Sequence, residues 1–208
     1  RRSSYFTDEL MAALELVEGG IEPAQMEGSW AGAMGQTQFM PSAYRRFAVD
    51  GDGDGKIDLW GSVPGALASA AHFLNKLGWQ SGLRWGREVR LPEGFPYEQA
   101  GRSNERSLDA WRELGVLRAD GGPLAGGAIK ASLLVPAGHQ GPAFLVYHNF
   151  DVIMGWNRSE SYAISVGHLA DRITGGGSLH QPPPDAPPLS VATAEQLQVR
   201  LNELGFDA

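Results

Sequence analysis

The 208-residue sequence contains no cysteine, which excludes disulfide bridges, thiolate metal sites and a cysteine nucleophile. It also lacks any apolar run long enough to cross a bilayer, so no transmembrane segment is predicted. Basic residues are in the minority, with 17 Lys and Arg against 24 Asp and Glu, and the formal net charge is −7. Because nucleic-acid binding needs a basic face, nucleic acid is not an expected partner.

The remaining composition is that of a globular protein, with 42% apolar and 20% charged residues. A chain of this length can bury a sizeable core in one large domain or two small ones. Apolar residues at helical spacing predict helices near residues 3–18, 41–47 and 63–77, and a last one ending near 173. Short apolar runs at about 131–135 and 143–147 predict an antiparallel pair of strands.

The same periodicity predicts which helix faces are buried. In the first helix the apolar residues Phe6, Leu10 and Leu14 follow one face, and Glu9 is expected on the opposite, solvated face. In the third helix Leu67 and Leu74 belong to the expected buried stripe, with Ala71 and Leu77.

Residues 28–42 form the most informative segment, reading GSWAGAMGQTQFMPS. Its three glycines disfavour the interior of a helix, and its large apolar side chains disfavour a turn exposed to solvent. Glycine permits close approach of backbone to backbone or ligand, and the two glutamines supply polar groups among apolar ones. This mixture is typical of the floor of a binding groove. From composition alone, a tight and buried corner between two helices is the competing interpretation.

The segment closely resembles the signature of the membrane-bound lytic murein transglycosylase B family, enzymes that cleave the glycan strands of bacterial peptidoglycan. The resemblance extends from Arg1 to about Ile173. It implies an α+β, mainly helical fold, with a lysozyme-like core made of residues 1–79 and 148–175. Residues 80–147 are expected to form a small β-containing insertion on this core.

By resemblance, the reaction needs one carboxylic acid and no cofactor. The acid protonates the glycosidic oxygen, the substrate's C6 hydroxyl attacks C1, and a 1,6-anhydro-MurNAc end forms without consumption of water. In the family this acid is the glutamate of a Glu-(Ser/Thr)-x-(aromatic)-Gly motif. The motif is absent from the 208 residues, so no catalytic residue is assigned here. We expect the glutamate upstream of Arg1, and this chain by itself to be inactive.

The resemblance also implies substrate-binding residues. Ser29 and Gln38 are expected to hydrogen-bond the acid or the sugar substituents. A later segment contains Trp156, Asn157 and Tyr162, whose aromatic rings would contact sugars while the amide shapes the loop. Aromatic residues before a helix are also common in protein cores, which is the competing interpretation. Finally, Arg1 and Arg2 match a basic pair that the family has near its groove. Such a pair could bind peptide or lactyl carboxylates.

Residues 50–58, DGDGDGKID, follow the first nine positions of an EF-hand loop. Its candidate calcium ligands are the side chains of Asp50, Asp52, Asp54 and Asp58 and the backbone carbonyl of Lys56. The closing glutamate is missing, because position 12 is Gly61, and Gly65 stands where relatives place an acidic residue instead. Weak calcium binding, sodium or no ion, and a purely structural turn all remain open.

The end of the chain predicts a linker and a further segment. Residues 176–190 are rich in glycine and proline, which indicates a stiff linker, and 191–208 resemble the start of a peptidoglycan-binding module. The expected partner is the peptidoglycan glycan strand, and the expected state is a monomer in the periplasm or cell envelope of a bacterium, with association to the outer membrane left open. The alternatives are a non-catalytic peptidoglycan-binding protein and a calcium-dependent structural protein.

Overall fold

The computed structural model describes residues 3–185 and 189–206. Within these residues the α-helices are α1 (Ser3–Glu18), α2 (Pro41–Phe47), α3 (Val63–Lys76), α4 (Leu108–Glu113), α5 (His148–Trp156), α6 (Glu160–Ile173) and α7 (Val191–Glu203). The strands are β1 (Gly86–Arg90), β2 (Arg106–Ser107), β3 (Leu117–Arg118), β4 (Lys130–Leu134) and β5 (Ala143–Val146). Two single 3₁₀ turns occur at Pro23–Gln25 and Tyr97–Gln99. The predicted α+β, mainly helical fold class is confirmed.

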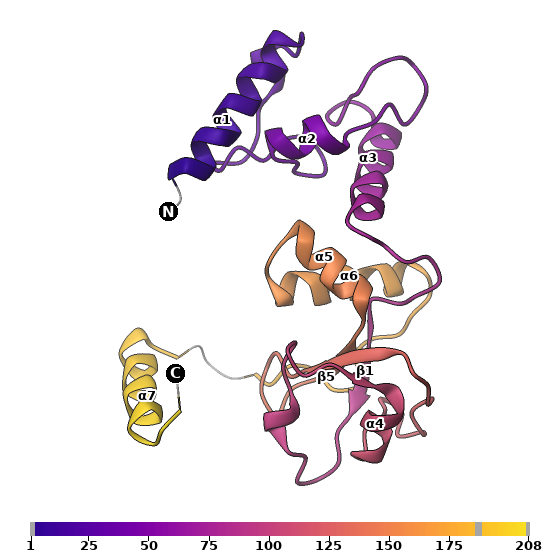
Figure 1. The fold of residues 1–208 in the computed structure, drawn as a ribbon, viewed down its shortest axis with the longest axis vertical. Helices are drawn as coiled ribbons and strands as arrows, with labels where there is room; N and C mark the ends of the chain where they lie inside the picture. The colour runs from indigo at the N-terminus through magenta and orange to yellow at the C-terminus, as the bar shows by residue number, and fades with distance from the viewer. Residues whose placement is uncertain (1–2, 186–188, 207–208) are drawn as a thin grey trace.

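The elements gather in three groups along the long axis of the molecule (Figure 1). Helices α1, α2 and α3 form one end, α5 and α6 lie in the middle, and the sheet with α4 forms the other end. Helix α7 stands to one side of the sheet, and none of its residues is buried. No helix in the described ranges is both long and apolar enough to cross a membrane.

The sheet has the strand order β2-β4-β5-β1-β3, and all its pairings are antiparallel. The predicted pair of strands is present as β4 and β5, in a register that sets Leu133 opposite Leu145. Since side chains alternate between the two faces of a strand, the sheet contributes to two cores. Leu133 and Leu145 pack with Trp111 of α4 on one face, whereas Phe144 packs with α5 and α6 on the other.

The middle helices, α5 and α6, contact the residues just before β1 through hydrogen bonds and close packing. The buried Asn149 side chain of α5 accepts a hydrogen bond from the Gln80 N–H at 2.8 Å and donates to the Gln80 and Leu83 carbonyls at 2.9 and 2.7 Å. On α6, Gly167 lies against the indole ring of Trp85, so closely that a Cβ at this position would be 2.3 Å from the ring. The missing side chain therefore sets the distance between α6 and the sheet.

The buried faces of α1 and α3 differ from the prediction. On α1, Leu10 and Leu14 are more than half exposed, whereas Glu9 is buried. The helix packs on α2, its buried residues are Glu9, Ala12 and Leu16, and Glu9 accepts hydrogen bonds from Ser42 of α2. On α3 the predicted residues Leu67 and Ala71 are exposed, and Gly65, Ala66 and Ser69 form the buried side.

The contact between α6 and the sheet gives a stability prediction. Replacing Gly167→Ala forces a methyl group into Trp85, which should lower the free energy of unfolding by about 1–3 kcal/mol. Urea unfolding followed by tryptophan fluorescence measures this. The matched control is Gly177→Ala, since a Cβ at Gly177 would meet open space. Equal stability of the two variants would contradict the close approach.

Candidate glycan-binding groove

The glycine-rich segment folds into two tight reversals. Residue pairs Gly28–Met34 and Met34–Phe39 form antiparallel bridges, and Met34 and Phe39 exchange hydrogen bonds of 2.8 and 2.9 Å. A Cβ at Gly28 would lie 2.3 Å from the Ala33 carbonyl oxygen, so glycine is required there. Gly35 has φ +69° and lies against Leu59. This packing buries Met34 and Phe39 and leaves the adjacent polar side chains at the surface.

A groove of about 430 Å³ runs beside this segment, between α1, α2, α3 and the end of α5. Its floor is a group of aromatic rings. The Trp156 ring lies 5.1 Å from Phe39 and 4.8 Å from Phe73, measured between ring centroids, and Phe73 stacks on Phe47 at 4.3 Å. Polar and charged side chains stand around these rings: Tyr5, Glu9, Gln38, Ser42, Arg46 and Arg158.

Glu9 is the groove's carboxylate, and it is only 7% exposed. It accepts hydrogen bonds from the Ser42 N–H at 2.9 Å and from the Ser42 hydroxyl at 2.7 Å. One of its oxygens thus receives an N–H at the start of α2, which fixes α1 against α2. Burial raises the pKa of the neighbouring Tyr5 above 10.0, and the negative charge of Glu9 and a hydrogen bond to it raise it further.

Two of the residues predicted to bind substrate line the groove, Gln38 and Trp156. Gln38 has φ 53°, and its side-chain amide donates to the Gly35 carbonyl at 3.0 Å. Ser29 and Asn157 instead hold their own loops: the Ser29 hydroxyl accepts from the Ala33 N–H at 3.1 Å, and the Asn157 amide oxygen accepts from the Ser159 N–H at 3.0 Å. Tyr162 lies on α6 with its side chain partly exposed.

Several features of the groove were not predicted from the sequence. Arg46 and Arg158 add positive charge to its wall, and Tyr5 and Glu9 close one side. Arg158 lies two residues after Trp156, so its place next to the predicted sugar-binding segment could have identified it from the sequence. Trp30, at the tip of the first reversal, is 92% exposed. The predicted pair Arg1 and Arg2 lies outside the described residues.

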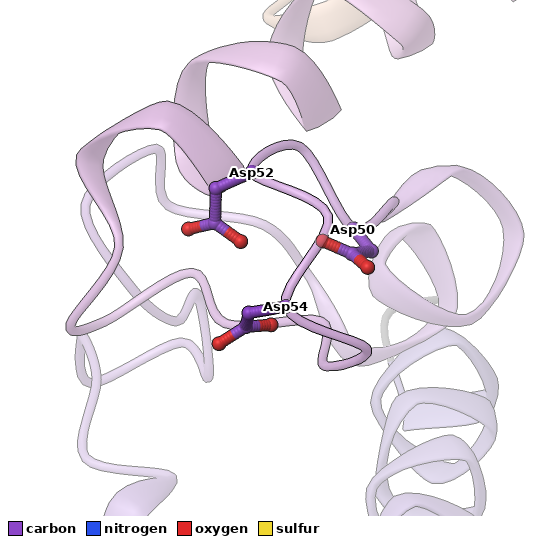
Figure 2. Close-up of side chains that lie close together, drawn as sticks. All are labelled: Asp50, Asp52 and Asp54. Atoms are coloured by element: carbon purple, nitrogen blue, oxygen red, sulfur yellow. The ribbon is translucent and has the colours of Figure 1, made fainter.

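The acidic loop brings Asp50, Asp52 and Asp54 together, with one carboxylate oxygen of each within 4.8 Å of the others (Figure 2). Asp50 accepts hydrogen bonds from the Gly53 and Gly55 N–H groups at 2.7 and 2.9 Å. The Gly55 hydrogen bond, followed by that of Gly53, holds the pKa of Asp50 below its ordinary 3.8.

Two of the other predicted ligands have local roles. Asp58 accepts hydrogen bonds from the Trp60 and Gly61 N–H groups, each at 2.8 Å, and so stabilises the turn that follows the loop. The Lys56 N–H donates to Asp54 at 2.8 Å. A Cβ at Gly61 would be 2.6 Å from an Asp58 carboxylate oxygen, and one at Gly65 would be 2.8 Å from the Asp58 carbonyl. Both positions for a closing carboxylate therefore hold tightly packed glycines.

The acidic loop nevertheless has the donor chemistry that a hard cation requires. Calcium takes six to eight oxygen ligands, and Asp50, Asp52 and Asp54 offer carboxylate oxygens from the same side of one loop. The residues therefore fit calcium in donor type but supply only part of its coordination sphere. Backbone carbonyls and water would have to complete it.

The sequence matches the Transglycosylase SLT domain family over residues 1–171. This match covers most of the chain, so the chain belongs to the family, and the resemblance found in the sequence is confirmed.

Among particular relatives, membrane-bound lytic murein transglycosylase B of Escherichia coli is 32% identical over 186 residues, which are 83% of this chain and 47% of that protein. The structure of SltB3 from Pseudomonas aeruginosa in complex with NAG-NAM-pentapeptide superimposes with a TM-score of 0.91 at 48% identity, covering 100% of this chain and 56% of that one. Escherichia coli lytic transglycosylase SLT35 in complex with calcium gives a TM-score of 0.69 at 32% identity, covering 84% and 55%. The chain thus spans about half the length of these relatives.

The Glu9 contacts give a prediction about Tyr5. The change Glu9→Gln removes the negative charge, so the pKa of Tyr5 should fall toward 10.0, and loss of a charged acceptor for Ser42 should cost about 1–3 kcal/mol of stability. In the wild type the folded-state pKa is the higher one, so stability is full below pH 10 and declines as the pH rises through the folded-state value.

Ultraviolet titration of the phenol groups, as a difference between wild type and variant, measures this shift. The control is Asp8→Asn, which removes an exposed carboxylate from the same helix. A Tyr5 pKa that moves equally in both variants would show that the general charge of α1, and not the Glu9 contact, is responsible.

Proposed function

We propose that this chain forms the substrate-binding part of a peptidoglycan lytic transglycosylase. The enzyme would cleave the bond between MurNAc and GlcNAc and leave 1,6-anhydro-MurNAc ends. The observation that carries the proposal is the groove in which Trp156 lies over Phe39 and Phe73, beside Gln38. Membership of the family and the sugar-peptide complex of SltB3 support it.

The groove has the groups that recognise a sugar chain. A half-buried indole held at a fixed angle offers a flat apolar face on which a pyranose ring can stack. Gln38, Arg46 and Arg158 supply hydrogen-bond donors for hydroxyl, acetamido and carboxylate groups. We place Ser29, Asn157 and Tyr162 at the ends of this binding path, where Ser29 and Asn157 would act by shaping their loops. Arg1 and Arg2 would meet the lactyl or peptide carboxylates.

We infer that the catalytic acid is not Glu9. Both Glu9 oxygens already accept hydrogen bonds from Ser42, so this carboxylate serves as a positioning group between two helices.

The acid would come from a segment preceding Arg1 and would need no cofactor. The large exposed side chains Phe6, Leu10 and Leu14, on the outer face of α1, form an apolar surface suited to such a segment. A segment anchored there would still have to pass around α1 to bring its glutamate to the groove, where a water-poor setting would raise the pKa of the acid and keep it protonated.

For the acidic loop we propose calcium binding of low affinity through Asp50, Asp52 and Asp54, with the carbonyl of Lys56 and the side chain of Asp58 as further ligands after rearrangement. The calcium complex of SLT35 supports this assignment. The glycines at 61 and 65 leave the site without a closing carboxylate, which predicts a dissociation constant on the order of 10⁻⁴–10⁻³ M. The protein would work as a monomer in the envelope of a bacterium, on the side where peptidoglycan is found.

The enzymatic proposal is tested on purified sacculi. A longer protein that contains this chain and an upstream Glu-(Ser/Thr)-x-(aromatic)-Gly motif should release 1,6-anhydro ends, detected by mass spectrometry, whereas the 208-residue chain should bind glycan and release none. Trp156→Ala should lower the rate at least about tenfold, because a stacking contact of about 1.4 kcal/mol is lost. Trp156→Phe keeps a ring and serves as the control, with thermal melts to verify folding.

Glycan binding without any anhydro product in the longer protein would select the non-catalytic binding protein instead. Release of anhydro ends by the 208 residues alone would overturn the placement of the acid.

The calcium proposal is tested by thermal unfolding. At a calcium concentration ten times the dissociation constant, binding should add about 1.4 kcal/mol to the stability of the wild type. The double change Asp52→Asn with Asp54→Asn should abolish this gain, while Asp8→Asn should preserve it. An equal gain from sodium chloride at matched ionic strength would indicate sodium binding or charge screening instead of a calcium site. No gain from either salt would indicate a purely structural turn.

A further inference from the structure

A second cavity, of about 440 Å³, lies beside α6 and shares no lining residue with the groove. Its walls are the first half of β1, the residues after β3, one face of α6 and residues 176–180. Trp85, Phe144 and Leu179 give it an apolar part. The rest is strongly polar, with three arginines and two histidines facing three carboxylates.

The carboxylates of this cavity are already satisfied by donors from the protein. Glu88 holds residues 180–181 through the His180 and Gln181 N–H groups, each at 2.8 Å. Asp171 accepts hydrogen bonds from Trp85 Nε1 at 3.0 Å and from Arg84 at 3.4 Å. Asp120 accepts hydrogen bonds from Arg118 and, at 3.0 Å, from the Gly122 N–H.

Arg87 differs from the other cations in the cavity. Its guanidinium lies 5.5 Å from the centroid of the Tyr147 ring. Burial raises the pKa of Tyr147, whereas the charge of Arg87 and a hydrogen bond from it to the hydroxyl lower that pKa. The buried Nε itself has no acceptor in standard hydrogen-bond geometry. No carboxylate among the described residues forms an ion pair with it. A buried donor without an acceptor is costly, and a charged one more so. His168, on the facing side of α6, also makes no hydrogen bond or ion pair in the part of the chain described.

The backbone of β1 has an edge without a strand partner close to Arg87. Along one side, β1 pairs with β5 from Gly86 to Val89. Along its other side, β3 pairs only with Val89 and Arg90, so residues 86–88 have no strand partner there among the described residues. An unpaired strand edge accepts an extended peptide through main-chain hydrogen bonds.

We propose that this cavity is a binding site for a short, carboxylate-bearing peptide in extended form. The peptide backbone runs along residues 86–88 of β1, and a carboxylate on the Tyr147 side of this edge pairs with Arg87. On the α6 side, His168 offers a further donor. Small apolar side chains of the ligand lie against Trp85 and Phe144. If the proposed function holds, the stem peptide of peptidoglycan is the natural ligand, because it carries free carboxylates and small methyl side chains. This last assignment rests on the proposed function, whereas the carboxylate-peptide site does not.

The test uses the indole N–H signals of the six tryptophans in a proton–nitrogen NMR spectrum of the whole 208-residue chain. The probe is the tripeptide L-Ala-γ-D-Glu-meso-diaminopimelate. Its addition should shift the signal of Trp85, whose indole N–H donates to Asp171 in the cavity wall. The signal of Trp111 should stay fixed, since its indole N–H donates to Ala131 in the core behind the sheet. The signal of Trp156 reports entry into the groove.

Arg87→Gln should weaken tripeptide binding about tenfold, since it removes a charge-assisted contact. The matched control is Arg112→Gln, which removes an exposed arginine of α4 that pairs with Asp109. Amidation of the tripeptide carboxylates should weaken binding by a similar factor. The wild-type shifts decide the matter even if the Arg87 variant does not fold.

No shift of Trp85, or a shift of Trp156 in its place, would overturn the inference and leave the glycan proposal standing. Equal binding of the all-L peptide Ala-Glu-Ala supports the site but overturns the stem peptide as its specific ligand. A Trp85 shift in a protein that releases no anhydro ends supports the cavity assignment independently of catalysis.

Discussion

The contact of Trp156 with Phe39 and Phe73 is the interaction on which the arrangement of the functional surfaces depends. Trp156 ends α5, Phe39 belongs to the glycine-rich segment and Phe73 to α3, so the three rings join parts of the chain that are far apart in sequence. Phe39 meets each of the other two rings edge to face and is buried, whereas Trp156 and Phe73 are tilted against each other and half-buried. The groove lies along these rings.

The segments that carry these rings are held in place by residues that a larger side chain could not replace or that make specific hydrogen bonds. Gly28 allows the first reversal to close, and Gly35 lets Phe39 be buried against the loop that contains Leu59. On the other side, Asn149 ties α5 to the insertion, and Gly167 lets α6 lie directly on Trp85. Residues 80–85 and the sheet that follows them therefore form the base on which α5, and with it Trp156, is positioned.

Charge is distributed unevenly in spite of the net value of −7. The groove wall contains Arg46 and Arg158, and the second cavity contains Arg84, Arg87 and Arg118. Carboxylates also lie in both places: Glu9 in the groove, and Glu88, Asp120 and Asp171 in the cavity. An acidic protein can nevertheless offer arginines to a ligand that carries carboxylates, since local potential depends on nearby groups more than on total charge.

The sequence by itself determined α1, α2, α3 and α6, the β4–β5 pair and the glycine-rich segment, because these depend on local spacing of apolar residues and on turn chemistry. It also identified Gln38, Trp156 and the acidic loop, since each belongs to a short contiguous motif. Only the tertiary structure decided that Glu9 is buried while Leu10 and Leu14 are exposed, because helical periodicity defines two faces but not which one meets a partner. The cavity around Arg87 depends on the tertiary structure to a greater degree: its walls come from β1, β3, α6 and residues 176–180, and no local pattern records that long-range packing brings these segments together.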